Sequence, residues 1–212
     1  MNPLFKGWVL GLIGTVLATQ AGAQEMSLHE SYSLWHITAS MGMQSTEDVE
    51  NSHGQSVIGR LAFQYMPIQH IGLELGIQSG DTMRFSAAKE MVDALGGVGV
   101  VGIIKPMMDV LITAKSPHVS SSLPLYASLK AGVAYRQLQM DRESLNDLYQ
   151  IKPEFQAGLG YQINQRLDVS VLYQYVAGGD PKIQANPMTE RGRILNIPNQ
   201  KALFLGLTYT LG

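Results

Sequence analysis

The chain has 212 residues, no cysteine and a formal net charge of −2 at pH 7. The lack of cysteine excludes disulfides and thiol chemistry, and the near-neutral charge excludes the basic footprint of a nucleic-acid-binding protein. Charged residues make up only 15% of the chain, and glycine accounts for 22 residues. A typical soluble domain has roughly 25% charged residues. The composition therefore favours a β protein with an unusual surface.

The first segment has the pattern of a targeting sequence. It begins MNPLFKGWVLGLIGTVLATQAGAQ, with one positive charge at Lys6, an apolar run over 8–18 and a small-x-small site at Ala21-Gly22-Ala23. This pattern predicts a signal peptide at 1–23, cleaved between Ala23 and Gln24, and an exported domain at 24–212. The alternative is a membrane anchor, but the apolar run is shorter than the roughly 20 residues that a spanning helix needs.

Apolar residues then recur at every second position, which is typical of β-strands with one apolar face. The clearest case is 70–79, where Ile71, Leu73, Leu75 and Ile77 alternate with small or polar residues. The same period predicts strands at 33–43, 56–66, 70–79, 107–116, 124–139, 153–163, 167–177 and in the closing stretch 200–212.

The fourth strand has two candidate positions. The segment 107–116 alternates well and lies a turn's length before the fifth strand, whereas the preceding glycine-rich segment 96–105 alternates less clearly. We favour 107–116 and place 96–105 in a long loop, which leaves open whether that loop is partly strand-like.

The connections alternate in length along the chain. Short ones are expected at 67–70, 117–123 and 164–166, and long ones at 44–55, 80–106, 140–152 and 178–199. Strands that run up and down, with tight turns at one end and long loops at the other, are typical of outer-membrane barrels. The sequence thus predicts an all-β, eight-stranded antiparallel up-and-down transmembrane β-barrel in the outer membrane of a Gram-negative bacterium, with its loops extracellular.

The polar faces of these strands carry mostly small residues and eight isolated charges of mixed sign. An eight-stranded lumen is just wide enough to be filled by side chains, and charges buried there must be paired. We therefore predict a packed polar lumen that contains Arg60, Glu74, Asp109, Lys115, Lys130, Arg136, Glu154 and Asp168. The alternative is a soluble, exported lipocalin-like barrel whose apolar side chains face inward on a ligand.

Aromatic residues fall near both ends of the expected strands and on the apolar face. Membrane barrels place such residues at the two lipid–water interfaces. The expected girdle near the short turns contains Trp35, Tyr65, Tyr161 and Tyr209, and the one near the long loops contains Tyr135, Phe155, Tyr173 and Tyr175.

The stretches LITAKSP, LYASLKAGVAYR and PEFQAGLGYQINQRLDVSVLYQY resemble the transmembrane domain of the OmpA-like outer-membrane β-barrel family. The resemblance covers about 30–212 and implies a luminal ion-pair network, here matched by Arg60, Glu74, Lys115, Lys130 and Arg136. The chain stops after the eighth strand, so we expect no peptidoglycan-binding domain. Its last residue is Gly212 rather than an aromatic, with Tyr209 nearest, which weakens the expected signal for the insertion machinery.

The expected function is a structural or surface-contact role, including adhesion, through the four long loops. The expected partners are outer-membrane lipid and lipopolysaccharide, the insertion machinery, and a host or surface ligand. The enzymatic alternative is a lipid A acylase or deacylase that uses His118 and Ser120, but no acidic residue lies nearby to orient the histidine. A pore is disfavoured because water-filled channels need about 16 strands. No cofactor or metal site is expected, because the five histidines show no ligand spacing.

Overall fold

The computed structural model describes residues 34–46, 54–80, 82–85, 100–120, 123–140, 145–179, 183–186 and 191–211. The chain divides into two units, Met1–Tyr32 and Ser33–Gly212. The first unit, with the predicted signal peptide and cleavage site, lies outside the described residues, so the following concerns the second unit. Within the described ranges, no helix is long and apolar enough to cross a membrane.

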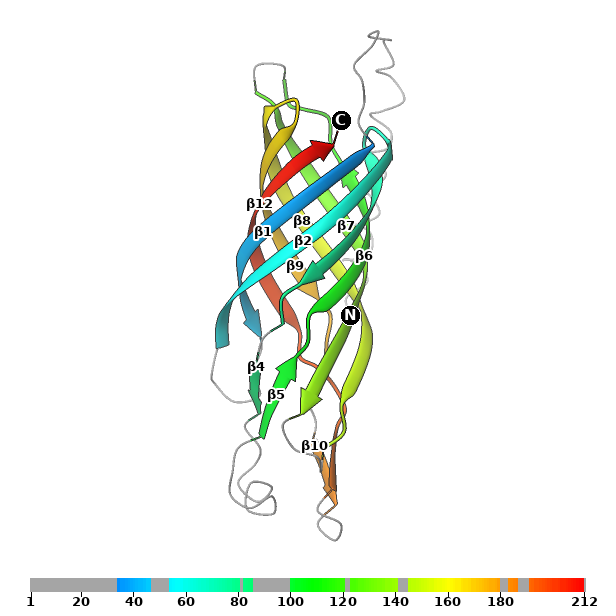
Figure 1. The fold of residues 1–212 in the computed structure, drawn as a ribbon, viewed down its shortest axis with the longest axis vertical. Coiled ribbons are helices and arrows are strands. Elements are labelled where there is room, and N and C mark those ends of the chain that lie inside the picture. Colours follow the sequence, from blue (N-terminus) through cyan, green and yellow to red (C-terminus); the bar gives the residue numbers. More distant parts are fainter. Residues whose placement is uncertain are drawn as a thin grey trace, which may run out of the picture. The chain divides into compact units, whose positions relative to one another are not determined.

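Eight strands form a closed antiparallel barrel, as Figure 1 shows. They follow one another around the barrel in chain order, and the last pairs with the first. The barrel strands are β1 (Trp35–Thr46), β2 (Gly54–Ile68), β3 (Ile71–Gln78), β6 (Met107–Lys115), β7 (Leu125–Met140), β8 (Leu148–Asn164), β9 (Leu167–Val176) and β12 (Gln200–Leu211). The predicted eight-stranded up-and-down fold is confirmed.

The barrel closes between β1 and β12. Their register runs without interruption from Trp35 opposite Leu211 to Thr46 opposite Gln200. Figure 1 shows these two strands side by side with β2 next to β1. Because every barrel strand has two neighbours, the sheet has no free edge along its membrane-facing length.

The two-residue period decides which side chains enter the barrel. In β12, Ala202 and Phe204 are buried in the lumen, whereas Leu203 and Leu205 point outward and are more than half exposed. The same alternation holds along β6, where Asp109 faces inward between exposed neighbours. One face of each strand therefore packs into the lumen, and the other forms the outer wall.

The two candidate segments for the fourth strand both pair with β7. The barrel strand is β6, as expected, but β5 (Val100–Ile104) continues along β7 beyond the start of β6. Between them the Lys105 N–H donates to the Gln137 carbonyl at 2.9 Å. Pro106 comes next and has no N–H to continue the ladder. The glycine-rich segment expected to be a loop thus ends in a strand, which also pairs with β4 (Thr82–Phe85).

The third long connection is shorter than predicted because β8 begins at Leu148, five residues before the expected start at Pro153. The Pro153 carbonyl accepts a hydrogen bond from the Ala177 N–H at 2.9 Å, so the Pro153 nitrogen faces the same side, toward β9. The β8–β9 pairing ends at Glu154 opposite Val176. A proline is tolerated there because the β8–β9 ladder ends at this point and needs no further donor from its nitrogen.

The other long connections also differ from the predicted loops. β1 extends to Thr46 and β2 begins at Gly54, which shortens the first connection. The fourth connection contains a separate hairpin of β10 (Ile183–Asn186) and β11 (Arg191–Ile194). Strand propensity there was hidden because four-residue strands are too short to show a period.

We predict that Gly132→Ala destabilises the barrel and that Gly59→Ala does not. A Cβ on Gly132 would collide with the Val110 carbonyl of the neighbouring strand, whereas one on Gly59 would meet nothing nearer than 4.0 Å. Overpacking of this kind costs about 1–3 kcal/mol. Denaturant unfolding of both variants in the same micelles measures the difference, and equal stabilities would contradict the close packing at Gly132.

Candidate functional site

The outer wall of the barrel is apolar over its whole circumference. Side chains from all eight barrel strands are exposed at roughly 36–72%, among them Met41, Val57, Leu75, Ile112, Leu129, Leu159, Val171 and Leu205. A soluble monomer rarely exposes contiguous apolar patches above a few hundred Å². A wall of this kind is suited to hydrocarbon as its solvent.

The aromatic residues of the predicted girdles lie on this outer wall in two bands. Near the short turns, Trp35 stands opposite Tyr65, and Tyr209 stands opposite Leu167. Near the long connections, Phe155 stands opposite Tyr175. The other predicted members occupy the corresponding ends of their strands, namely Tyr161 in the first band, and Tyr135 and Tyr173 in the second.

The spacing of the two bands fits a bilayer. On β12, Tyr209 belongs to the first band, and Lys201, eight residues earlier, pairs with Tyr175 of the second. Eight residues span about 27 Å along a strand, or about 20 Å across the bilayer at the usual tilt, near the roughly 25 Å apolar band of outer-membrane barrels.

Sequence reasoning missed Phe63, whose ring stacks on Trp35 at a centroid distance of 5.0 Å.

Four of the predicted luminal charges meet at the centre of the barrel wall formed by β2, β3, β6 and β7. Arg60 Nη2 donates to Glu74 Oε1 at 2.8 Å, and its Nε donates to Asp109 Oδ2 at 3.0 Å. Lys130 Nζ donates to both Glu74 oxygens at 2.9 and 2.7 Å. Because two cations and two carboxylates are buried together, the cluster is neutral and its charges compensate one another.

The other four predicted charges lie apart from this cluster, each in its own setting. Arg136 donates to the Pro198 carbonyl at 2.9 Å. Glu154 accepts from the side-chain amides of Gln156 and Gln174 at 2.6 Å each. These amides belong to a larger set of luminal glutamines, all buried: Gln44, Gln64, Gln78, Gln156, Gln174 and Gln200. Their positions on the polar face were the only sequence signal for this role.

Asp168 and Lys115 lie near the short-turn end of the lumen. Asp168 accepts a hydrogen bond from the Tyr126 hydroxyl at 3.1 Å, and Lys115 Nζ lies 5.4 Å from the centroid of the same ring. The Tyr126 ring packs against the backbone of Gly160, where a Cβ would overlap it. Tyr126 therefore organises this end of the lumen, as an aromatic that points inward rather than toward lipid.

Apolar clusters fill the lumen on the long-connection side. The outermost cluster, called the cork here, consists of Ile104, Leu138, Met140, Leu145, Ile194 and Ile197, all buried. Two further clusters lie inside the barrel, one with Met107, Ala134 and Val176 and one with Ile58, Leu172, Ala202 and Phe204. Together with the buried polar groups, these side chains pack the lumen over the described strands.

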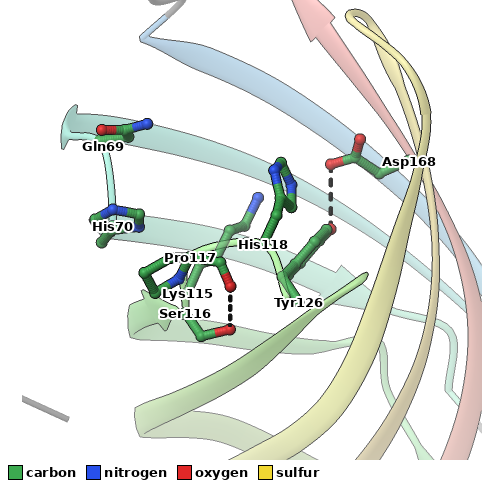
Figure 2. Close-up of a pocket in the computed structure, with 8 residues that line it drawn as sticks. All are labelled: Gln69, His70, Lys115, Ser116, Pro117, His118, Tyr126 and Asp168. Carbon is green, nitrogen blue, oxygen red and sulfur yellow. Dashed lines mark hydrogen bonds between the residues drawn. The ribbon is translucent and has the colours of Figure 1, made fainter. Parts of the chain in front are cut away.

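A pocket of about 220 Å³ opens at the short-turn end. Figure 2 shows the side chains that line it: Gln69, His70, Lys115, Ser116, Pro117, His118, Tyr126 and Asp168. They come from the β2–β3 turn, from the end of β6 and the β6–β7 connection, and from the starts of β7 and β9. Burial lowers the pKa of the His70 imidazole below its usual value.

His118 and Ser120, the residues of the enzymatic alternative, each contact a different residue of the structure. The His118 ring lies 5.8 Å from the Tyr126 ring, measured between centroids, and Ser120 Oγ accepts from the Leu123 N–H at 3.0 Å. Among the residues that the structure describes, no group of three or more histidine, aspartate or glutamate side chains has the arrangement of a metal site.

Comparison with solved structures finds proteins of similar fold. Neisserial surface protein A matches with a TM-score of 0.57 and 12% identity, over 86% of this chain and all of that one. Two further structures match less well. Ail of Yersinia pestis has a TM-score of 0.46 and 11% identity, over 84% of this chain and 97% of that one. E. coli outer membrane protein W has a TM-score of 0.46 and 14% identity, over 86% of this chain and all of that one. This chain has the fold of a small transmembrane β-barrel.

At such identities the likeness concerns the fold and carries no finer property. No family model and no curated protein matches the sequence. The likeness therefore does not show an OmpA-like relationship.

We predict that Glu74→Ala destabilises the barrel by about 3–5 kcal/mol, because it leaves Lys130 buried without its carboxylate partner. The double variant Glu74→Gln/Lys130→Met removes both charges of that pair and keeps Arg60 bound to Asp109. It should therefore be more stable than Glu74→Ala. Unfolding free energies in one detergent measure this difference, and a double variant as unstable as the single one would argue against charge compensation.

Proposed function

We propose that this chain is an exported outer-membrane protein whose closed barrel carries four long connections on the cell surface, where they serve a structural or surface-contact role. The proposal includes an OmpA-like relationship, insertion by the outer-membrane assembly machinery, and outer-membrane lipid and lipopolysaccharide as its surroundings. The adhesive form of this role requires a host or surface ligand that binds the long connections.

The observation that carries the proposal is the contrast between the two faces of the barrel. The exposed face is apolar on every barrel strand, whereas the buried face holds the neutral ion cluster and the glutamines. A soluble lipocalin-like barrel would need the reverse arrangement, with apolar side chains around an internal ligand. Lipid outside and packed polar groups inside are what a small membrane barrel requires.

A closed barrel suits a role in surface contact better than one in transport. The cork fills the long-connection end of the lumen, and Arg136 is fully buried and bonded to the carbonyl of Pro198, the residue after Ile197 of the cork. We also propose that the protein is not an enzyme, because the contacts of His118 and Ser120 with Tyr126 and Leu123 are those of a structured turn. Binding would then reside in the connections, where functional residues on rigid scaffolds are commonly found.

We predict that Leu205→Arg strongly impairs the barrel in bilayers. Leu205 is 61% exposed on the outer wall and pairs with Met41 and Val171 in the middle of its strands. An arginine at the midplane of a lipid-facing wall costs about 2–4 kcal/mol, whereas at a water-exposed position it would cost almost nothing. Folding yield into vesicles, read from the heat-modifiable band on unboiled gels, measures the effect. A normal yield would contradict the membrane assignment.

We predict that the two ends of the barrel are labelled from opposite sides of the outer membrane. The wild-type chain has no cysteine, so single substitutions give background-free thiol labelling. Asn146→Cys, exposed between β7 and β8, should react with an impermeant maleimide in intact cells. Val119→Cys, 68% exposed in the β6–β7 connection, should react only after permeabilisation. The opposite pattern would invert the proposed orientation, and equal labelling in intact cells would reject it.

A further inference from the structure

Lys115 differs from the other luminal cations in its contacts. Arg60 and Lys130 bind carboxylates, and Arg136 binds the Pro198 carbonyl. Within the part of the chain that the structure describes, Lys115 Nζ forms no ion pair, and its recorded side-chain contact is the face of the Tyr126 ring at 5.4 Å. A largely buried ammonium group without an anion is costly unless something else compensates it.

The groups around Lys115 are mostly hydrogen-bond donors. Gln69, His70 and His118 line the same pocket from two connections. The Gln69 amide and the His118 ring carry N–H donors, whereas the His70 ring is already hydrogen-bonded to the Lys115 backbone. Figure 2 shows Lys115 and His118 next to the Tyr126 ring, with Gln69 and His70 on the neighbouring turn. The pocket, at about 220 Å³, is smaller than the roughly 300–1,000 Å³ of sites for drug-sized ligands. It suits a small ligand with several acceptor oxygens.

Asp168 is the one carboxylate that lines the pocket. Its charge attracts Lys115 from a distance, but the two side chains form no direct ion pair among the described residues, and its Oδ2 accepts the Tyr126 hydroxyl at 3.1 Å. The hydrogen bond holds this carboxylate at the hydroxyl end of the Tyr126 ring, and Figure 2 shows it apart from Gln69 and His70. The half of the pocket nearest Lys115 therefore presents a cation and neutral donors.

We propose that this pocket binds a phosphate group, with Lys115 as its charged anchor, with Gln69 and His118 as donors to its oxygens, and with His70 on the wall of the pocket beside them. A lysine ammonium is a common point-charge partner of phosphate, and charge-assisted hydrogen bonds are roughly twice as strong as neutral ones. The group would come from free phosphate or from the headgroup of a phospholipid at the same membrane face. The site does not depend on which side of the membrane the short turns occupy.

The test is a titration of the refolded barrel with inorganic phosphate in phosphate-free, nonionic detergent micelles. Calorimetry measures the affinity, and the NMR shifts of the His70 and His118 rings report the location. We expect saturable binding with shifts at both rings. Lys115→Gln should weaken the affinity by about tenfold or more, whereas Lys115→Arg should stay within a few-fold of wild type. A lack of saturable binding by the wild type would overturn the proposal.

Two matched variants separate a bound anion from a purely structural role of Lys115. Lys105→Gln makes the same chemical change at the other end of the barrel, where the residue lies between β5 and β6, and should bind as wild type does. Asp168→Asn keeps an acceptor for the Tyr126 hydroxyl but removes the negative charge, so it should tighten phosphate binding. Equal affinities of Lys115→Gln and wild type would reject the site. The heat-modifiable band shows that each variant is folded.

A second arm identifies the source of the phosphate group. The titration is repeated in vesicles of phosphatidylethanolamine and in vesicles of a phosphate-free galactolipid. A weaker apparent affinity in the phospholipid vesicles means that headgroups occupy the pocket, and equal affinities mean that free phosphate is the ligand. In both kinds of vesicle Lys115→Gln should bind phosphate more weakly than wild type does, and a variant that binds as tightly as wild type contradicts the proposal.

Discussion

The hydrogen bonds between β1 and β12 are the constraint on which the rest of this structure depends. In hydrocarbon, a backbone N–H or C=O group has no water to bond, so a sheet can span a bilayer only when its last strand pairs with its first. The uninterrupted register from Trp35–Leu211 to Thr46–Gln200 meets this requirement. Once the barrel is closed, successive side chains of each strand point alternately to its outer face and into the lumen.

Closure of the barrel also encloses polar side chains in a narrow lumen, where charged groups and amides bind one another. An interior narrow enough to be filled by side chains leaves little room for water, so each polar group needs a protein partner. Glu74 meets this need with two cations, and Glu154 meets it with two glutamine amides. The contacts of Glu74 join β2, β3 and β7, and those of Glu154 join β8 and β9. The polar lumen therefore ties together strands that are next to or close to one another around the wall.

The sequence was sufficient to predict the strands of the barrel wall. It was only partly sufficient to predict the contacts in the lumen and where the strands end. A two-residue period depends on adjacent positions alone, and it correctly located all eight barrel strands, including the choice of 107–116 for the fourth. The early start of β8 could not be read, because Pro153 normally marks a strand boundary and its tolerance depends on where β9 ends. The alternation of side chains along each strand was enough to predict that the eight charges point inward. Which groups they contact depends on the register between strands, which the sequence does not show.

The pocket was the least predictable feature because it is assembled from separate turns. His70, Lys115 and Asp168 belong to three strands or turns, and no spacing in the sequence links them. The sequence pointed instead to His118 and Ser120, which are close in the chain but have different neighbours in the structure. Tyr126 was recognised as an inward exception among the aromatics, and its position between Lys115 and Asp168 gives that exception a structural reason.

The cork has a consequence for how the surface of this protein can change. Ile194 and Ile197 belong to the fourth connection, yet they pack with Leu138 of the barrel wall, and the next residue, Pro198, binds Arg136. That connection therefore has two parts with different packing. The β10–β11 hairpin pairs within itself, whereas 194–198 is held to the barrel. A peptide inserted between β10 and β11 should leave the cork in place, and one inserted within 194–198 should disrupt it.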